Sequence, residues 1–285
     1  MNSQHGFVII DKPAGITSHD VVAKLRRTLG TKQVGHAGTL DPMATGVLVI
    51  GINNATKFLN YIVAGQKRYQ GTIRLGQSTT TDDREGEITS QSQTNSVIDD
   101  QIRKSLESFV GTIQQVPSSV SAIKVDGKRA YDRVRNGESV ELAPREITIH
   151  SLDILEIRRS DFIDIDIDVR CSAGTYIRAI ARDLGAKLGV GGHLTSLRRS
   201  EVAPFTLEDC CSLDNPIVRD LARSISKVLP MRTIDDSEIR DLRFGRMILA
   251  SQFQGVGVAC SSANDVIAII ENREGGAQPL TVFNS

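Results

Sequence analysis

The chain has 285 residues, 40% of them hydrophobic, and its 34 Lys and Arg residues balance 34 Asp and Glu residues. This composition supports a sizeable core, which we expect to be divided between one large and one small domain. The zero net charge argues against a protein that binds nucleic acid through its overall charge. The four cysteines have no C-x-x-C spacing, which argues against a zinc site or a disulfide framework and indicates reduced thiols.

The charges are unevenly distributed along the chain. Residues 1–80 contain nine Lys and Arg against three Asp and Glu, and residues 170–200 contain six against one. Two basic stretches of this kind are typical of a surface that follows the phosphates of a nucleic acid. Solvated helix faces remain the alternative.

The first part of the chain predicts strands at 6–11 and 47–50, with a helix between them. Ser18 is expected to cap this helix and Gly30 to end it, with an apolar face formed by Val21, Val22, Leu25 and Leu29. Residues 67–75 alternate as a half-buried strand does, so Tyr69 should point toward the core or into a cleft.

The run Gly-His-Ala-Gly-Thr-Leu-Asp-Pro-Met-Ala-Thr-Gly-Val-Leu at 35–48 places one carboxylate, Asp41, in a loop of small residues. The glycines permit backbone angles closed to other residues, and Pro42 restrains the chain directly after the acid. A carboxylate fixed in this way suggests nucleophilic or base chemistry. An ordinary surface turn that begins at Asp-Pro is the alternative.

The remainder predicts a polar loop at 76–96, a helix with Ile98, Ile102, Leu106 and Phe109 on one face, and an insertion at 117–144. A strand at 162–170 should lead into a helix whose first turn carries Tyr176 and Arg178. Its apolar face is Ile177, Ile180, Leu184 and Leu188. Beyond a helical segment bracketed by Pro216 and Pro230, short strands are expected at 256–260, 266–270 and 280–283.

Several motifs in order resemble the bacterial tRNA pseudouridine synthase B family over roughly the first 230 residues. They comprise Lys-Pro at 12–13, the run at 35–48, Lys-Arg-Tyr-Gln-Gly-Thr at 67–72, Thr-Asp-Asp-Arg-Glu-Gly at 81–86, Gln-Val-Pro-Ser at 115–118, Lys-Arg-Ala-Tyr at 128–131, Gly-Thr-Tyr-Ile-Arg at 174–178 and Leu-Thr-Ser-Leu-Arg-Arg at 194–199. The resemblance implies an α+β fold with a mixed central sheet flanked by helices and loops. It also implies a catalytic domain at 1–230, a thumb-like insertion at 117–144 and a small β-rich RNA-binding domain of the PUA kind at 231–285.

By the same resemblance the chain would isomerise uridine to pseudouridine at position 55 in the T loop of tRNA. Asp41 would be the catalytic acid, Arg178 its charge partner and Tyr69 the residue that stacks on the target base. Tyr176 and Leu197 would line the uracil pocket, and His36 would fill the space left by the extruded nucleotide. Candidate phosphate contacts are Lys12, Lys124, Lys128, Arg129, Arg133 and Arg135; for the individual charges of the insertion, solvent exposure without a contact is the alternative.

The implied reaction needs no metal or other cofactor, and the expected partner is the T-arm stem-loop of tRNA. We expect a cytoplasmic protein without a membrane segment, and a monomer. A pseudouridine synthase acting on another RNA, and an additional role as a tRNA-folding chaperone, remain alternatives. An aspartate-nucleophile phosphatase is disfavoured because no second acid stands near Asp41 in the sequence.

Overall fold

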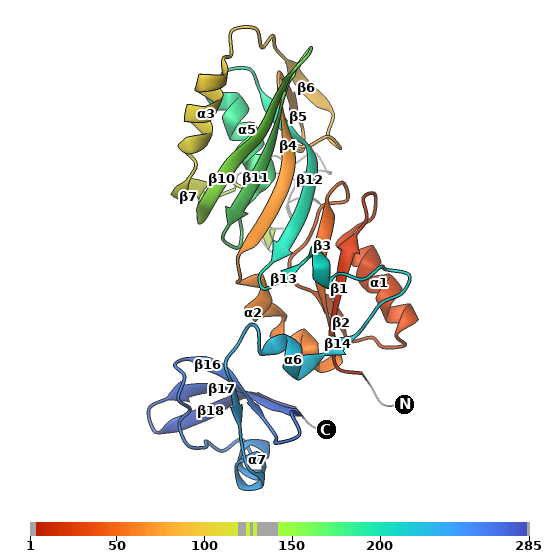
Figure 1. Ribbon diagram of the computed structural model, residues 1–285, viewed down its shortest axis with the longest axis vertical. Coiled ribbons are helices and arrows are strands. Elements are labelled where there is room, and N and C mark those ends of the chain that lie inside the picture. The colour runs from red at the N-terminus through yellow and green to blue at the C-terminus, as the bar shows by residue number, and fades with distance from the viewer. Residues whose placement is uncertain (1–3, 119–123, 126–127, 130–141, 284–285) are drawn as a thin grey trace.

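The computed structural model describes residues 4–118, 124–125, 128–129 and 142–283. These residues form an elongated molecule with a large sheet at one end and a smaller sheet at the other (Figure 1). The expectation of an α+β fold with a mixed central sheet is confirmed.

The large sheet has ten strands in the order β14-β1-β3-β12-β4-β11-β10-β7, with β2 paired to β3 and β13 paired to β12. All neighbours are antiparallel except β3 and β12, which meet in parallel with Arg199 opposite Gly46. This junction joins the two halves of the sheet. The strands are β1 (Gly6–Lys12), β2 (Val34–His36), β3 (Thr45–Ile52), β4 (Lys67–Leu75), β7 (Gly111–Gln115), β10 (Arg145–Arg159), β11 (Ile163–Cys171), β12 (Gly192–Val202), β13 (Phe205–Thr206) and β14 (Arg219–Asp220).

Helices α3 (Asp99–Glu107) and α5 (Ile177–Lys187) pack against one face of the long strands β4, β10, β11 and β12 (Figure 1). The alternation along β4 accounts for this arrangement, because its odd-numbered residues, Tyr69 among them, are buried and its even-numbered ones are not. The expected orientation of Tyr69 is thus confirmed. The other helical elements of the large part are α1 (Ser18–Thr28), η1 (Asn53–Phe58), α2 (Leu59–Val63), η2 (Leu207–Asp209) and α6 (Leu221–Ile225).

Helix α1 is capped by Thr17, and the expectation that Ser18 would cap it was wrong. The Thr17 hydroxyl accepts a hydrogen bond from the amide of Asp20, whose carboxylate accepts one from the Thr17 amide, which completes a capping box. Ser18 is buried instead, and its hydroxyl exchanges hydrogen bonds with the backbone of Leu40. The start of α1 therefore supports the loop that contains Asp41.

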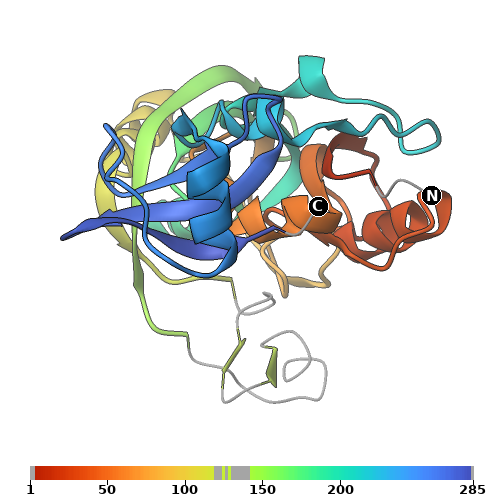
Figure 2. The ribbon, with the colours of Figure 1, turned by 90° about the horizontal axis from the view of Figure 1, so that it is seen from below.

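The segment at 76–96 contains a hairpin of β5 (Gln77–Thr79) and β6 (Ile88–Gln91), where the sequence indicated only loop. The inserted segment contains a second hairpin, β8 (Lys124–Val125) and β9 (Lys128–Arg129). Figure 2 shows this hairpin lying apart from the body of the molecule. Lys124, Lys128 and Arg129 lie on it, whereas Arg133 and Arg135 lie outside the described residues.

The smaller sheet consists of β15 (Met231–Thr233), β16 (Val256–Cys260), β17 (Val266–Arg273) and β18 (Gly276–Val282), with helix α7 (Asp236–Arg243) beside it. The strands expected at 256–260 and 266–270 are confirmed, and the third begins earlier than expected. An apolar cluster joins the two parts of the chain: the rings of Phe58 and Phe283 stack with centroids 5.4 Å apart. The small sheet is therefore anchored to the large part through side-chain packing.

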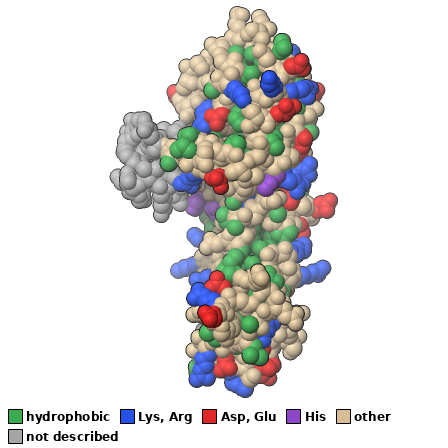
Figure 3. All heavy atoms as spheres, turned by 90° about the vertical axis from the view of Figure 1, so that its left-hand side faces the viewer, with side chains coloured by type: hydrophobic (Ala, Val, Ile, Leu, Met, Phe, Trp, Pro, Cys, Tyr) green, Lys and Arg blue, Asp and Glu red, His purple; other side chains and the backbone are tan. Residues whose placement is uncertain are grey.

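Acidic and basic side chains are interspersed on the face shown in Figure 3. Many cations of the two basic stretches have acidic partners, such as Arg68 with Asp168 at 2.7 Å and Arg198 with Asp11 at 2.7 Å. Much of the positive charge that suggested a phosphate-binding surface is therefore already paired. Within the described residues, no helix combines the length and the apolar character needed to cross a membrane.

Candidate active site

A cavity of about 240 Å³ lies where the loop after β2, the start of β4, the start of α5 and the middle of β12 meet. It brings together five of the residues singled out from the sequence: Asp41, Tyr69, Tyr176, Arg178 and Leu197. They come from segments up to 156 positions apart, so the fold is what gathers them.

The loop that carries Asp41 is held at both of its ends. Gly46 adopts φ +102°, and a Cβ atom there would lie 2.1 Å from the carbonyl oxygen of Arg199 on the parallel strand. Only glycine fits this approach. Before Asp41, the Leu40 amide donates to the Ser18 hydroxyl at 2.9 Å, and directly after it the Pro42 carbonyl accepts a hydrogen bond from the Gly15 amide at 2.8 Å. Asp41 consequently has little freedom to move.

Asp41 and Arg178 form a two-point contact. Arg178 Nε lies 3.1 Å from Asp41 Oδ2, and Nη2 donates to Oδ1 at 3.3 Å. The Arg178 side chain is only 6% exposed, whereas that of Asp41 is 33% exposed and faces the cavity. Burial raises the pKa of the Asp41 carboxyl, and the Arg178 charge opposes this increase. Arg178 therefore favours the ionised carboxylate in a site that otherwise disfavours charge.

Asp83 holds the far side of the same guanidinium. Arg178 Nη1 lies 3.1 Å from Asp83 Oδ2 and donates to the Thr81 carbonyl at 2.9 Å. Asp83 is itself fixed, because its Oδ1 accepts hydrogen bonds from the Thr81 hydroxyl at 2.6 Å and the Glu85 amide at 3.0 Å. Its side chain is 3% exposed. Arg178 thus lies between one carboxylate that faces the cavity and one that is enclosed.

Tyr69 and Arg199 form the wall of the cavity beside the ion-paired residues Asp41, Arg178 and Asp83. They are cross-strand neighbours on β4 and β12, and both are buried. The Arg199 guanidinium donates to the carbonyls of Val47 at 2.8 Å and Gly38 at 3.1 Å. Burial raises the pKa of the Tyr69 phenol, while the nearby charge of Arg199 opposes that effect. Arg199 therefore bonds to the backbone of the loop that carries Asp41 and lies beside the ring of Tyr69 on the next strand.

Lys12 is buried, which corrects the expectation that it contacts phosphate. Its side chain is fully enclosed, and Nζ donates to the carbonyls of Ile16 at 2.7 Å, Pro13 at 2.9 Å and Pro42 at 3.3 Å. Burial lowers the pKa of the Lys12 ammonium to about 8. Lys12 therefore bonds from within the protein to the backbone of Pro42, the residue that follows Asp41. It offers no donor to an external phosphate.

His36 ends β2 at the edge of the sheet and does not line the cavity. Its ring meets the ring of His19 from α1 edge-on, with centroids 5.6 Å apart and planes at 80°. The two imidazoles lie on the neighbouring elements β2 and α1. His36 is therefore outside the group of five residues that line the cavity.

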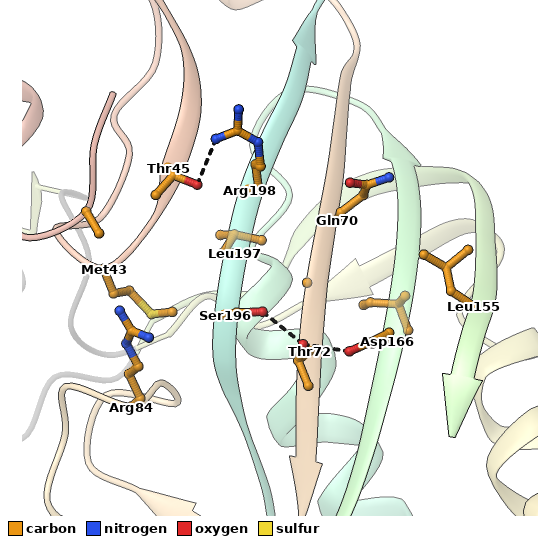
Figure 4. Close-up of a pocket in the computed structure, with 13 residues that line it drawn as sticks. Met43, Thr45, Gln70, Thr72, Arg84, Leu155, Asp166, Ser196, Leu197 and Arg198 are labelled. Carbon is orange, nitrogen blue, oxygen red and sulfur yellow. Dashed lines mark hydrogen bonds between the residues drawn. The ribbon is translucent and has the colours of Figure 1, made fainter. Parts of the chain in front are cut away.

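A second hollow, of about 380 Å³, lies on the polar face of the sheet (Figure 4). Its polar side chains bond mainly to one another: Ser196 donates to Thr72, which donates to Asp166. Leu197 borders both hollows, but Asp41 does not line this one. The chemical groups therefore favour the cavity on the helix-covered side as the active site.

The sequence analysis missed three charged residues of the site, namely Lys67, Asp83 and Arg199. Lys67 lines the cavity and donates to the carbonyls of Val63 and Gly65, and burial lowers the pKa of its ammonium to about 8. All three stand inside motifs that the resemblance quoted, which was a usable signal. Within the described residues, no three His, Cys, Asp or Glu side chains gather as a metal site requires.

Comparisons with known proteins identify the class of fold first. A solved chain in the "Crystal Structure of a Cbf5-Nop10-Gar1 Complex" superimposes with a TM-score of 0.71 at 24% identity, over 98% of this chain and 84% of that one. A chain from "Crystal structure of the archaeal box H/ACA sRNP Nop10-Cbf5 complex" gives a TM-score of 0.70 at 23% identity, over 98% of this chain and 86% of that one. The chain has the pseudouridine synthase fold.

The family follows from sequence. A model of the TruB family pseudouridylate synthase N-terminal domain matches residues 26–177, and one of the tRNA pseudouridylate synthase B C-terminal domain matches residues 178–223. Proteins named tRNA pseudouridine synthase B are 51% identical in Corynebacterium efficiens, over 98% of this chain and 95% of that protein, and 49% identical in Thermobifida fusca, over 98% of each. This chain belongs to the TruB family of pseudouridylate synthases.

Proposed function

We propose that this enzyme isomerises uridine to pseudouridine at position 55 in the T loop of tRNA, with Asp41 as its catalytic acid. The observation that carries the proposal is the carboxylate of Asp41, which faces the cavity while Arg178 holds it at two points. The curated relatives named tRNA pseudouridine synthase B support tRNA as the substrate. The choice of the T loop as the target and of Asp41 as the catalytic residue are the more specific parts of the proposal.

The reaction detaches uracil from ribose at N1 and rejoins it through C5. Asp41 attacks ribose C1′, attacks uracil C6 or removes a ribose proton. Each route needs an ionised carboxylate, which the Arg178 contact favours. The bound nucleotide must also keep water from the ribosyl centre, because water would otherwise capture it.

A stacked uridine cannot enter this cavity, so the nucleotide is flipped out of the loop at a cost of a few kcal/mol. Tyr69 then packs against the uracil ring, and Tyr176 and Leu197 border it. His36 enters the space that the base has left. Stacking of an aromatic ring on a base contributes about 1–3 kcal/mol, which offsets much of that cost.

We assign residues 1–230 to the catalytic domain, with 117–144 as its thumb, and 231–285 to a small RNA-binding domain of the PUA kind. The hairpin of β8 and β9 stands apart from the body of the molecule, where RNA can reach it. Lys124, Lys128 and Arg129 then contact phosphates of the T arm.

The test is incubation of the protein with an unmodified T-arm stem-loop, followed by site-resolved detection of pseudouridine. We expect product at position 55 only, and none with Asp41→Asn, which should still bind the RNA. Pseudouridine at a different site, or only in another RNA, would replace the proposed substrate. Normal turnover by Asp41→Asn would remove Asp41 from the mechanism.

The same variant separates catalysis from RNA folding. If Asp41→Asn restores the folding of a misfolded tRNA as well as the wild type does, then the protein is also a chaperone. If it does not, the isomerisation accounts for the function.

A further inference from the structure

Four Lys and Arg side chains are buried among the described residues, and all four surround the candidate active site. They are Lys12, Lys67, Arg178 and Arg199. Because a charge removed from water is costly unless it is paired, each such cation needs an explanation. The four do not have equivalent partners.

Arg178 has two carboxylate partners, Asp41 and Asp83, so its charge is more than balanced. The two lysines donate only to carbonyls. Burial lowers the pKa of each ammonium to about 8, so each lysine is neutral in a fraction of the molecules near that pH. Arg199 differs from all three, because a guanidinium keeps its proton in proteins.

Arg199 is 1% exposed and forms no ion pair with any described residue. Its hydrogen bonds run to the carbonyls of Val47 and Gly38, with a longer contact to that of Thr39 at 3.5 Å. These acceptors are neutral. The positive charge at the cavity wall is therefore permanent and lacks a neighbouring carboxylate within ion-pair distance.

The backbone of β12 and β3 brings the Arg199 guanidinium to the cavity. Arg199 lies opposite Gly46 at the one parallel junction of the sheet, where a side chain at position 46 would collide with the Arg199 carbonyl. The Gly38 carbonyl also accepts a hydrogen bond from Arg199 Nη2 at 3.1 Å. The glycine at position 46 thus accommodates Arg199.

We propose that Arg199 supplies a permanent, unneutralised positive charge at the cavity wall and stabilises the electron pair that the uracil ring receives during the reaction. This inference rests on the proposed function, but it does not depend on the route taken by Asp41. In every route the base becomes electron-rich before the new bond forms.

The electron count is the same at the end of each route. When Asp41 attacks C1′ or a ribose proton is removed, the C1′–N1 bond breaks and its pair remains on the uracil. When Asp41 attacks C6, the C5–C6 π pair moves toward C4 and its oxygen, and the C1′–N1 bond then breaks with its pair on N1. After the base turns, a pair at C5 forms the bond to C1′. In the first route this displaces the Asp41 carboxylate from C1′, in the second the proton returns to the ribose, and in the third Asp41 leaves C6 with its electron pair as the C5–C6 double bond re-forms. In each route the proton on C5 leaves and N1 takes up a proton. A fixed positive charge beside the ring stabilises the electron-rich stage and requires no reorganisation.

The test compares Arg199→Gln and Arg199→Lys in single-turnover reactions on the T-arm stem-loop, with RNA affinity and Tm measured for each. Loss of one fixed electrostatic group typically lowers a rate by about 10²–10³-fold, which we expect for Arg199→Gln. Arg199→Lys keeps the charge and should react at least about tenfold faster than Arg199→Gln. RNA affinity should change little, because Arg199 is buried.

Chemical rescue separates charge from hydrogen bonding. Guanidinium chloride should accelerate Arg199→Ala, whereas urea, a planar molecule of similar shape without charge, should not at the same millimolar concentration. Arg158→Ala, on the polar face of the sheet and outside the cavity, is the matched control and should respond to neither compound.

Three results would overturn the inference: Arg199→Gln as fast as the wild type, Arg199→Lys no faster than Arg199→Gln, or equal rescue of Arg199→Ala by urea and guanidinium. If Arg199→Ala does not fold, the comparison of Lys with Gln decides alone. A wild-type protein that forms no pseudouridine in any RNA would overturn the proposed function and this inference together. The three results above would overturn the inference alone, so the two failures can be distinguished.

Discussion

Asp83 and Asp41 bind opposite sides of one guanidinium, although they lie in different loops. The enclosed Asp83 contacts Arg178 Nη1 at 3.1 Å, and the cavity-facing Asp41 contacts Nε at 3.1 Å and Nη2 at 3.3 Å. Arg178 can therefore neither rotate nor withdraw without breaking a charged contact. The aim of the proposed catalytic carboxylate therefore depends on Asp83, a residue that does not line the cavity.

We expect Asp83→Asn to slow pseudouridine formation by about 100-fold, because a displacement of about 1 Å at a reacting group can cost that much. RNA affinity should remain within a few-fold of the wild type. Single-turnover rates and a filter-binding titration measure the two quantities. Asp82→Asn is the matched control, since Asp82 pairs with Arg182 and both Asp and Asn tolerate its positive φ of 59°. Equal losses in the two variants would show that Asp83 has no particular role.

The raised pKa of Asp41 predicts how the rate depends on pH. The reaction needs the carboxylate, so the single-turnover rate should fall as acid protonates Asp41. The fall should begin above the ordinary aspartic acid pKa of about 3.9, because burial raises this pKa. A rate that stays constant down to that value would contradict the prediction.

The same shift predicts a change in stability. A carboxyl with a raised pKa in the folded state favours folding when it is protonated, and that contribution is lost as pH rises through the folded-state pKa. Asp41→Asn, which cannot ionise, should therefore have a higher Tm than the wild type near neutral pH. The difference should shrink as the pH is lowered, and differential scanning fluorimetry across pH would detect it. A lower Tm for the variant at neutral pH would mean that the Arg178 contact outweighs the burial of the charge.

Tyr69 should act in the chemical step. Its buried ring lines the cavity, and base–aromatic stacking contributes about 1–3 kcal/mol, so Tyr69→Leu should slow the single turnover by at least about tenfold. RNA affinity should change less than the rate. Tyr69→Phe keeps the ring and isolates the contribution of the hydroxyl, which lies near the charge of Arg199. Equal rates for wild type and Tyr69→Leu would exclude the stacking role.

Salt dependence of RNA binding distinguishes the buried lysine from the lysines of the β8–β9 hairpin. Each phosphate contact contributes about 0.7–0.9 to the slope of log affinity against log salt concentration. Lys12→Met should leave that slope unchanged, because Lys12 donates to backbone carbonyls. Lys128→Ala should reduce it by about one contact. The opposite pattern would contradict both assignments.

Parts of the site could be predicted from sequence. These are the parts where the placement of a side chain depends on the alternation along a strand or on its position in a helix. Alternation along β4 places Tyr69 on the buried face, and the start of α5 places Arg178 in the first turn. Both inferences use only neighbouring residues. The glycines and the proline around Asp41 likewise indicated a restrained loop.

The contacts between distant segments could not be predicted in this way. Strand β12 was missed because Gly192 to Val202 mixes basic and polar residues, and only its pairing with β3 and β4 makes it a central strand. The burial of Arg199 and the contact between Asp83 and Arg178 follow from that pairing and the packing of α5. Lys12 looks like the exposed end of a strand, and nothing local reveals the three carbonyls that surround its ammonium.

The stacking of Phe283 on Phe58 makes the last described residue a structural tie between the two sheets. Phe58 ends η1, the 3-10 helix that directly follows β3, and β3 in turn begins just after the loop with Asp41. Removal of the final few residues would therefore expose an apolar surface on the large part of the molecule. It would also remove a contact that holds the small sheet to that part. Truncations that remove Phe283 should accordingly lower the yield of folded enzyme.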